Sequence, residues 1–378
     1  MFWNHRFFFR IDFRILPIVW MLMMISIYVI SAMSTDPAVS FSEAFFSPLV
    51  KSQIKWFILG SFFFLFFIGL DYHRLREWAL FFYLLIILLL VGLYLTTPIQ
   101  NVQRWYRLPW ISMTLQPSEA AKLVVVLTLA WFLEKREQGV FSKATFLQAV
   151  VIVAVPFFLI LKQPDLGTAL VLYPITLVMF YFGGVRSGFV KMIGIVGLGA
   201  LIFVALLFLG FLSHDKMRPF FTSFLKEYQY ERLNPNTYHQ NAATTAIAIG
   251  GMTGKGWHKS EFSSRKWLPA PHTDSVFAAF GEETGFIGMT FLLLLYCLLI
   301  YCCFEVVISA KDLFGRLLAA GITMYLAIHI LMNIGMMCAF LPISGVPLVF
   351  ITYGGNSVLT TMAALGILQS IYARRFMF

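Results

Sequence analysis

Ten long apolar runs follow one another along this chain of 378 residues, and they constrain the fold more than any other feature of the sequence. They fall at about 15–33, 54–70, 78–96, 118–133, 146–161, 166–183, 192–213, 276–304, 317–340 and 357–373. A run of about 20 apolar residues is long enough to cross a bilayer as a helix. The pattern therefore predicts an all-α polytopic membrane protein with about ten transmembrane helices, in a single membrane domain covering residues 1–378.

The composition indicates the same fold class. Apolar residues make up 60% of the chain and charged residues 12%, whereas soluble domains average about 45–50% and about 25%. The chain also holds 41 Phe, which does not suit the alternating polar and apolar strands of a membrane β-barrel. These values exclude an ordinary soluble enzyme and a disordered chain. The four cysteines all fall in apolar runs, which predicts no disulfide framework.

The basic residues predict the orientation of the helices. The net charge is +10, which we attribute to the cytoplasmic loops of a membrane protein and not to nucleic-acid binding. With the N-terminus inside, the cytoplasmic segments hold 14 Lys and Arg and the short outer connections hold 5. We therefore predict a multi-pass protein of the cytoplasmic membrane with both termini in the cytoplasm. Residues 214–274 then form one large extracytoplasmic loop.

Polar side chains cluster just before and inside the fourth apolar run. Glu119 and Lys122 are three residues apart and share a helix face. An ion pair inside a span marks a function or a buried polar cluster, and a structural salt bridge is the alternative. Arg104 and Trp105 precede the run, where a guanidinium can bind a phosphate and an indole can stack on a sugar. An interfacial anchor is the alternative for Trp105.

Two further segments break the apolar pattern. Asp165 follows Gln163-Pro164 and begins a run, so it can cap that helix or belong to a site. Residues 341–357 hold two prolines and three glycines together with Ser344 and Tyr353. Non-helical backbone at membrane depth is tolerated only where protein or a water-filled cavity covers it. We therefore predict a re-entrant outer element that lines a site before the last helix.

The long loop combines basic and aromatic side chains with a net charge of +3. Lys255 lies in a glycine-rich run, 250–256, which fails the phosphate-loop pattern and is interpreted as a flexible turn or a backbone nest for an anion. His272 and Asp274 end the loop, where a carboxylate entering an apolar bundle is a candidate general base. Helix capping is the alternative for Asp274. The pair of His272 and Asp274 matches no zinc spacing.

Taken together and in order, these motifs resemble the SEDS family (shape, elongation, division and sporulation), most closely its RodA type. The resemblance covers essentially the whole chain. It rests on Arg104-Trp105, Gln116-Pro117-Ser118-Glu119 with Lys122, Gln163 through Gly167, His272-Thr273-Asp274, Gly281-Glu282-Glu283 with Gly285, and Pro342 through Tyr353-Gly354-Gly355. The sequence departs from many members at Ala270, Ser275, Val349, Thr352 and Asn356.

The resemblance implies a peptidoglycan glycosyltransferase that polymerises lipid II on the outer face of the bacterial inner membrane during cell elongation. It implies a class B penicillin-binding protein, the crosslinking transpeptidase, as partner, together with membrane proteins of the elongation complex. It also implies that Asp274 is the family's essential aspartate. Glu119 and Lys122 match the family's polar helix pair, and Trp105 matches its outer-loop tryptophan.

The chemistry of that reaction assigns roles to the candidate residues. The acceptor hydroxyl must lose a proton, which Asp274 can take, whereas the diphosphate leaving group needs cations. The candidate substrate-binding residues are Arg104, Trp105, Glu119, Lys122, Asp165, Lys255, His272, Ser344 and Tyr353. No cofactor is required by the sequence, and a divalent cation, Mg²⁺ or Mn²⁺, stays open as an additional charge.

Three alternatives stand beside this reading. One is a lipid II flippase or other transporter, although the sequence has no internal repeat and its polar motifs fall at the predicted outer ends of the helices. A second is a structural scaffold for wall-synthesis complexes, which should tolerate the loss of Asp274. The third is the division-type, FtsW-like paralogue of the same enzyme.

Overall fold

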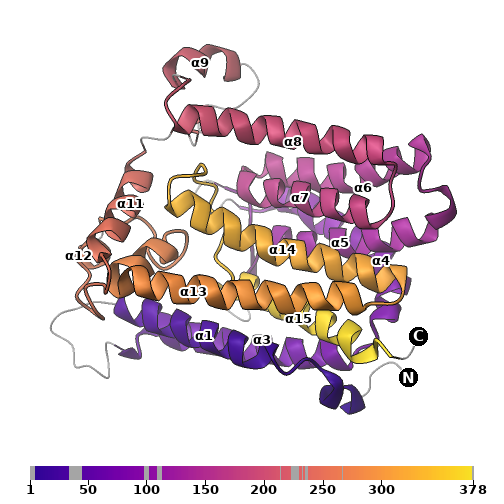
Figure 1. The fold of residues 1–378 in the computed structure, drawn as a ribbon, viewed down its shortest axis with the longest axis horizontal. Helices are drawn as coiled ribbons and strands as arrows, with labels where there is room; N and C mark the ends of the chain where they lie inside the picture. The colour runs from indigo at the N-terminus through magenta and orange to yellow at the C-terminus, as the bar shows by residue number, and fades with distance from the viewer. Residues whose placement is uncertain are drawn as a thin grey trace.

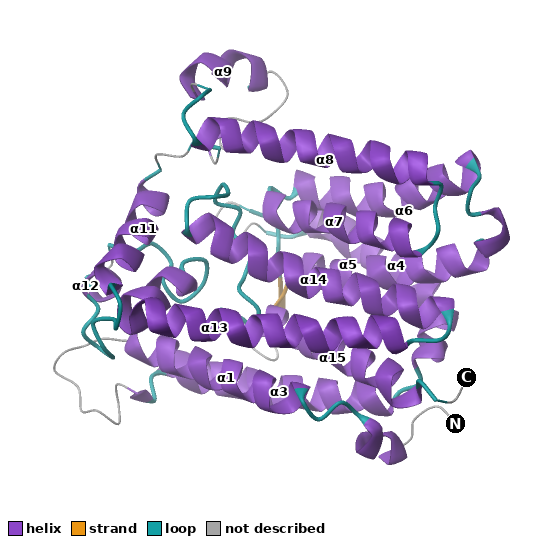
Figure 2. Ribbon diagram, viewed as in Figure 1, coloured by secondary structure: helices purple, strands orange, loops and turns teal. Residues whose placement is uncertain are grey.

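The computed structural model describes residues 5–33, 45–97, 102–108, 113–212, 214–222, 230–231, 233–234, 237–265 and 267–376. Helices account for most of these residues, and the strands among them form one antiparallel hairpin (Figure 2). The hairpin pairs β1 (Tyr106–Leu108) with β2 (Met113–Leu115). The prediction of an all-α membrane fold is confirmed.

Each of the ten predicted apolar runs is a helix. The helices are α1 (Ile15–Ala32), α3 (Pro48–Gly69), α4 (Tyr72–Gly92), α5 (Pro117–Lys135), α6 (Lys143–Lys162), α7 (Leu166–Phe182), α8 (Ser187–Phe208), α13 (Val276–Ser309), α14 (Leu313–Met337) and α15 (Gly355–Arg374). Within the described ranges, seven of these are long and apolar enough to cross a membrane, and α7 is a shorter apolar helix. The other two, α5 and α15, carry more polar side chains and are largely buried among their neighbours.

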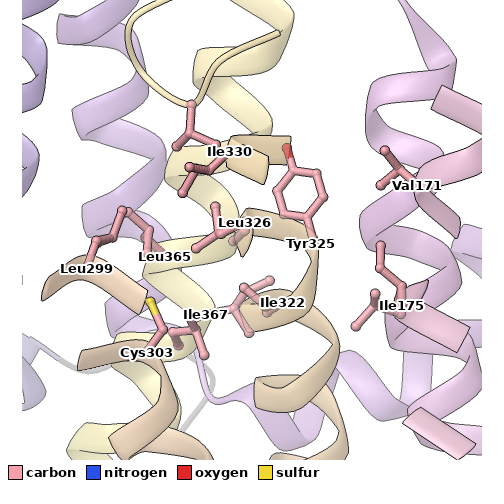
Figure 3. Close-up of a cluster of buried hydrophobic side chains, with 14 of the residues drawn as sticks. Val171, Ile175, Leu299, Cys303, Ile322, Tyr325, Leu326, Ile330, Leu365 and Ile367 are labelled. Atoms are coloured by element: carbon pink, nitrogen blue, oxygen red, sulfur yellow. The ribbon is translucent and has the colours of Figure 1, made fainter. Parts of the chain in front are cut away.

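The core of the bundle is apolar and lies around α14. Figure 3 shows Ile322, Tyr325, Leu326 and Ile330 of α14 between side chains of α7, α13 and α15, such as Val171. All of them are buried. By contrast, α8 runs along the edge of the bundle (Figure 1), and Leu207 is its one buried residue. A helix that is apolar on all sides yet mostly uncovered by protein suits contact with lipid.

Short helices complete the structure. They are η1 (His5–Arg10), η2 (Leu93–Leu95), η3 (Glu137–Gly139), α9 (His214–Phe221), α11 (Tyr238–Gly250) and α12 (Glu261–Ser264). The last three belong to the predicted long loop, of whose basic residues Lys226, Arg232 and Lys266 lie outside the described residues. In Figure 1, α11 and α12 lie at one end of the bundle and both chain termini lie at the other. This is the arrangement expected for an even number of spans.

The connection from α14 to α15, residues 338–354, is not helical, and its residues 344, 346 and 348–352 are buried. Its backbone carbonyls are satisfied by side chains from other helices. Tyr296 of α13 donates to Val349 O (2.7 Å), and Ser26 of α1 donates to Ile351 O (2.9 Å). Buried backbone groups need such partners. The prediction of non-helical backbone before the last helix is therefore confirmed, whereas its re-entrant course and its outer position stay a prediction. We call residues 338–354 the buried connection.

The glycine-rich run of the long loop packs on the first part of α13. That helix is kinked at Gly285, which has φ 66° and ψ −166°. A Cβ added at Gly254 would lie 2.1 Å from Glu283 O, so only glycine allows the two backbones to approach this closely. The N–H groups of Lys255 and Gly256 donate to the carbonyls of residues 282 and 283 (3.0 and 2.9 Å). The run is therefore a turn packed against α13, and the N–H groups of residues 251 and 254–256 are used in backbone hydrogen bonds and do not form a nest for an anion.

Candidate active site

Asp274 ends a tight turn, residues 269–275, immediately before α13. The helix begins at Val276 and its N-cap position is Ser275, which makes no side-chain capping hydrogen bond. Asp274 therefore stands one residue before the capping position, and the capping alternative is wrong. The residue is partly exposed.

Three consecutive backbone carbonyls, those of residues 272–274, are held by hydrogen bonds from other parts of the chain. The donors are Tyr353 N at 2.9 Å, Thr352 Oγ1 at 3.2 Å and Asn333 Nδ2 at 3.1 Å, in that order. Two come from the end of the buried connection and one from α14. The turn that carries Asp274 is thereby fixed by its backbone, independently of the aspartate side chain.

Gly345 of the buried connection lies beside the Asp274 carboxylate. A Cβ added at Gly345 would stand 3.5 Å from Asp274 Oδ2. Gly345 has φ 74° and is exposed, whereas its neighbours Ser344 and Val346 are buried. The missing side chain at position 345 therefore leaves room next to the carboxylate on the exposed side.

Two histidines flank the carboxylate. Burial lowers the pKa of both His239 and His272 below the ordinary value of 6.5, and the nearby Asp274 charge offsets part of that effect. Both rings are therefore largely neutral at neutral pH. The Ser275 hydroxyl donates to Pro269 O (2.8 Å), so at the 2.6 Å contact His239 Nε2–H must be the donor to Ser275. His239 thus ties α11 to the turn that carries Asp274.

Asp165 both caps a helix and belongs to a polar cluster. Its Oδ1 accepts from Thr168 N (3.4 Å) at the start of α7. Its Oδ2 accepts from Gln116 Nε2 and from Ser118 Oγ, each at 3.2 Å, at the start of α5. The Trp105 indole N–H donates to Gln116 Oε1 (3.2 Å). One hydrogen-bonded group therefore joins Trp105 to the ends of α5 and α7.

Arg104 contacts the same region through backbone carbonyls. Its Nε donates to Gln163 O (3.0 Å) and its Nη2 donates to Pro164 O. These carbonyls lie in the turn between α6 and α7, where helix C-terminal carbonyls attract cations. The guanidinium thus fixes that turn while it keeps a positive charge at this end of the bundle.

The Asp165 cluster meets the buried connection where α7 begins. A Cβ added at Gly167 would lie 2.3 Å from Ser344 O, so the two backbones are in direct contact. Ser344 is buried, and its hydroxyl donates to Met336 Sδ (3.7 Å). Asp165 lies two residues before Gly167, and Ser344 directly precedes Gly345 beside Asp274. The contact between Gly167 and Ser344 therefore connects the Asp165 cluster to the part of the chain that holds Asp274.

Tyr353 contacts the turn at His272. Its ring is in an edge-to-face contact with the His272 ring, with centroids 6.1 Å apart, and its hydroxyl donates to Ser52 Oγ of α3 (3.2 Å). Lys255 is placed differently. Its side chain is exposed and its backbone lies against Glu282 of α13. Of the predicted residues, Lys255 is therefore on a different turn from His272 and Asp274.

The predicted pair of Glu119 and Lys122 is fully inside the bundle. Lys122 Nζ lies 2.8 Å from Glu119 Oε1, and the two side chains are 0% and 4% exposed. Lys122 Nζ also lies 2.9 Å from His329 Nε2 and 5.3 Å from the centre of the Tyr325 ring, both on α14. A buried ion pair needs such further partners because neither charge is solvated.

Sequence reasoning missed His329, Asn333 and His239. His329 and Asn333 are four residues apart in a largely apolar helix, and polar side chains inside a span are themselves a signal of function. That signal was available in the sequence. For His239, in contrast, no local pattern indicates its partner Ser275, which lies 36 residues further along the chain.

A metal site is not formed by the described residues alone. Among them, no group of three or more His, Cys, Asp or Glu side chains is placed to hold an ion. His272 and Asp274 therefore do not supply a ligand set for Mg²⁺ or Mn²⁺ on their own.

The family model of the cell cycle proteins FtsW, RodA and SpoVE matches residues 13–376. The chain belongs to this family. It is the SEDS family that the ordered motifs indicate, so that prediction is confirmed. As a member of the family with many apolar helices, the chain is a multi-pass membrane protein.

Individual relatives cover most of the chain. Peptidoglycan glycosyltransferase MrdB of Escherichia coli K12 is 35% identical over 301 residues, 79% of each chain. Stage V sporulation protein E of Bacillus subtilis 168 is 31% identical over 357 residues, 92% of each. MrdB of Helicobacter pylori is 32% identical over 357 residues, 90% of this SEDS protein and 88% of the relative.

Solved structures share the fold. A chain from work on a peptidoglycan synthase complex that coordinates polymerization and crosslinking is 26% identical, with a TM-score of 0.77 over 97% of this chain and 99% of that one. The rod shape determining protein RodA of Thermus thermophilus is 24% identical, with a TM-score of 0.69 over 97% and 98%. The second likeness concerns the fold alone.

Proposed function

We propose that this protein is a peptidoglycan glycosyltransferase that polymerises lipid II into glycan strands during cell elongation. Relatives named as peptidoglycan glycosyltransferases support the reaction, and the structural neighbour from a peptidoglycan synthase complex supports the setting. The observation that carries the mechanism is the Asp274 carboxylate beside Gly345, on a turn whose backbone carbonyls accept three hydrogen bonds from other parts of the chain.

Asp274 is the general base of this proposal. Its carboxylate takes the proton from the acceptor sugar hydroxyl, whose oxygen forms a bond to the anomeric carbon of the donor. The bond from that carbon to the diphosphate breaks, and the diphosphate leaves with the electron pair. A single displacement of this kind inverts the configuration at the anomeric carbon. The space beside Gly345 is where the acceptor hydroxyl reaches the carboxylate.

The remaining polar groups bind and orient the substrate. The indole of Trp105, half-buried and held by Gln116, offers a face to a sugar ring. The positive charges of Arg104 and Lys255 favour the diphosphate. A divalent cation bound together with the substrate diphosphate would add to this charge. Neutral His239 and His272 leave the Asp274 carboxylate without a cationic imidazole beside it, which keeps it available as a base.

The reaction belongs on the outer face of the membrane in this proposal. Basic residues concentrate in the connections at the end that holds the termini, which predicts that this end is cytoplasmic. The turn with Asp274 then faces outward, where no ATP is present and a lipid diphosphate supplies the activation. A class B penicillin-binding protein that crosslinks the strands is the proposed partner, within the membrane complex for elongation.

The test of the function is polymerisation of lipid II by the purified protein together with its class B partner. Glycan strands resolved by electrophoresis are expected with the wild-type protein and not with the partner alone. Transport of fluorescent lipid II across vesicles, without strand formation, would support the flippase alternative instead. Absence of both activities, with normal binding of the partner, would support the scaffold alternative.

A further inference from the structure

Asn333 of α14 joins the Asp274 turn to the buried connection. Its side chain is fully buried, and its Nδ2 group donates to Asp274 O (3.1 Å) and to Val346 O (2.8 Å). The two hydrogens of the amide are both used in this way. Because Gly345 directly precedes Val346, this one side chain sets the distance between the Asp274 backbone and the residue beside its carboxylate.

His329 holds the next residue of the buried connection. It is one helical turn before Asn333, so the two share a face of α14. Its Nδ1 lies 3.3 Å from Pro347 O and its Nε2 lies 2.9 Å from Lys122 Nζ. An ammonium group can only donate, so His329 Nε2 accepts. A carbonyl can only accept, so Nδ1 carries the hydrogen, and the ring is neutral in a single tautomer.

A continuous set of hydrogen bonds therefore links the buried ion pair to the candidate active site. It runs from Glu119 through Lys122 and His329 to Pro347. Lys122 is 0% exposed and His329 is 1% exposed, so water does not compete for these bonds. The polar side chains of α14 thus hold two successive carbonyls of the buried connection, at residues 346 and 347.

We propose that His329 and Asn333 are positioning residues, which place Gly345 and the Asp274 carboxylate at the separation that the transfer requires. The proposal deepens the proposed function and rests on it for its catalytic consequence. Neither residue touches the reacting atoms. They act through backbone carbonyls, and a misplacement of a catalytic group by about 1 Å can cost about 10²-fold in rate.

The test compares substitutions that keep or remove the hydrogen-bonding roles. In His329→Gln the side-chain amide offers one acceptor and one donor, separated much as the two ring nitrogens are. His329→Leu and Asn333→Leu offer neither. Thr323→Val is the matched control, since Thr323 is a buried residue of α14 whose hydroxyl has no hydrogen-bond partner among the described residues. All four are purified with the partner, and the folded amount is measured first.

The first readout is the rate of lipid II polymerisation per folded molecule. We expect kcat to fall at least about tenfold in His329→Leu and Asn333→Leu with KM changed less than about threefold. His329→Gln should stay within about threefold of wild type, and Thr323→Val should match it. Equal losses in Gln and Leu at position 329, or a wild-type kcat in both Leu variants, would overturn the proposal.

The second readout does not need activity. Hydrogen–deuterium exchange of the backbone amides at 344–346, 348 and 272–275 should be faster in both Leu variants and unchanged in His329→Gln. Unchanged exchange in Asn333→Leu would overturn the positioning role even if His329→Leu did not fold. If the wild-type protein formed no glycan, the proposed function would fail, and the exchange data would still decide whether these residues hold the site together.

Discussion

A methyl group added to Gly345 would stand 3.5 Å from Asp274 Oδ2, so these two residues from different connections are neighbours at the candidate active site. Because residue 345 has no side chain, it leaves space next to the carboxylate. A base that must reach a sugar hydroxyl needs such an approach, with heavy atoms about 2.6–3.2 Å apart.

Filling this space should impair catalysis. In Gly345→Ala the new methyl occupies the approach to Asp274, and we expect the rate of lipid II polymerisation to fall at least about tenfold. The alanine also has to adopt a positive φ, which costs about 1–2 kcal/mol. Gly210→Ala is the matched control, because Gly210 has φ 77° with open space around the added Cβ. A similar loss of activity in both variants would show that strain alone is responsible.

The buried ion pair of Glu119 and Lys122 should contribute strongly to the stability of the folded protein. Removing one partner, as in Glu119→Ala or Lys122→Ala, leaves an uncompensated charge inside the bundle, at a cost of about 3–5 kcal/mol. We expect a marked drop in the thermal unfolding temperature of the purified protein for each single variant. The exchanged pair, Glu119→Lys with Lys122→Glu, should recover part of it. Normal unfolding of both single variants would contradict the buried placement.

The exchanged pair also separates stability from activity. A glutamate at position 122 accepts hydrogen bonds, so it requires a hydrogen on His329 Nε2 and competes with the bond from Nδ1 to Pro347 O. We therefore expect the exchanged pair to regain unfolding temperature more completely than polymerisation rate. Equal recovery of both would contradict the link through His329.

Much of the fold could be predicted from the sequence because it depends on local pattern. A span needs about 20 consecutive apolar residues, and all ten predicted runs are helices whose ends lie within six residues of the expected ones. The buried connection was also predictable, since Pro342, Pro347 and Gly345 disfavour a helix. These features are read along the chain without knowledge of what packs against them.

The contacts that build the site could not be predicted in the same way. Asn333 donates a hydrogen bond to Asp274, which is 59 residues away in the sequence, and Arg104 donates one to Pro164, which is 60 residues away. A sequence shows which groups need partners, but the partners are chosen by how helices pack. Arg104 is an example. Its charge predicted a phosphate site, whereas in the structure two of its N–H groups donate to the backbone carbonyls of Gln163 and Pro164.

The histidines predict a pH dependence of stability. Burial lowers the pKa of His272 below 6.5 in the folded state, so the unfolded chain binds its proton first as the pH falls. The contribution of neutral His272 to the free energy of unfolding is therefore fully present above about pH 6.5 and is lost as the pH falls below that value. We expect His272→Gln to lose unfolding temperature less steeply than wild type between pH 6.5 and 5. Parallel curves would show that His272 takes up its proton equally in both states.

The orientation can be tested by labelling single cysteines in a variant that lacks the native ones. Met252 is 65% exposed in the turn beside α13, and Phe141 is 67% exposed between α5 and α6. In intact spheroplasts, Met252→Cys should react with an impermeant maleimide, and Phe141→Cys should react only after permeabilisation. The reverse pattern would place Asp274 on the cytoplasmic face and remove the basis for chemistry outside the membrane.

The decisive variant is Asp274→Asn. The hydrogen bond from Asn333 goes to the backbone carbonyl of residue 274, and the N-cap of α13 is Ser275, so the substitution leaves the turn and the helix start intact. Asparagine cannot take a proton, and general-base catalysis contributes about 10²–10⁴-fold. We therefore expect normal expression, normal unfolding temperature and partner binding, with polymerisation of lipid II at least about 100-fold slower.

Asp274→Glu extends the same argument. It keeps the carboxylate but moves it by about 1 Å, which can itself cost about 10²-fold, and the added methylene enters the space beside Gly345. A base acting at a fixed position predicts that both variants are poor, whereas a charge that only attracts substrate predicts that the glutamate retains activity. Near-normal polymerisation by the purified Asn variant would exclude Asp274 as the base and favour the scaffold or transporter alternative.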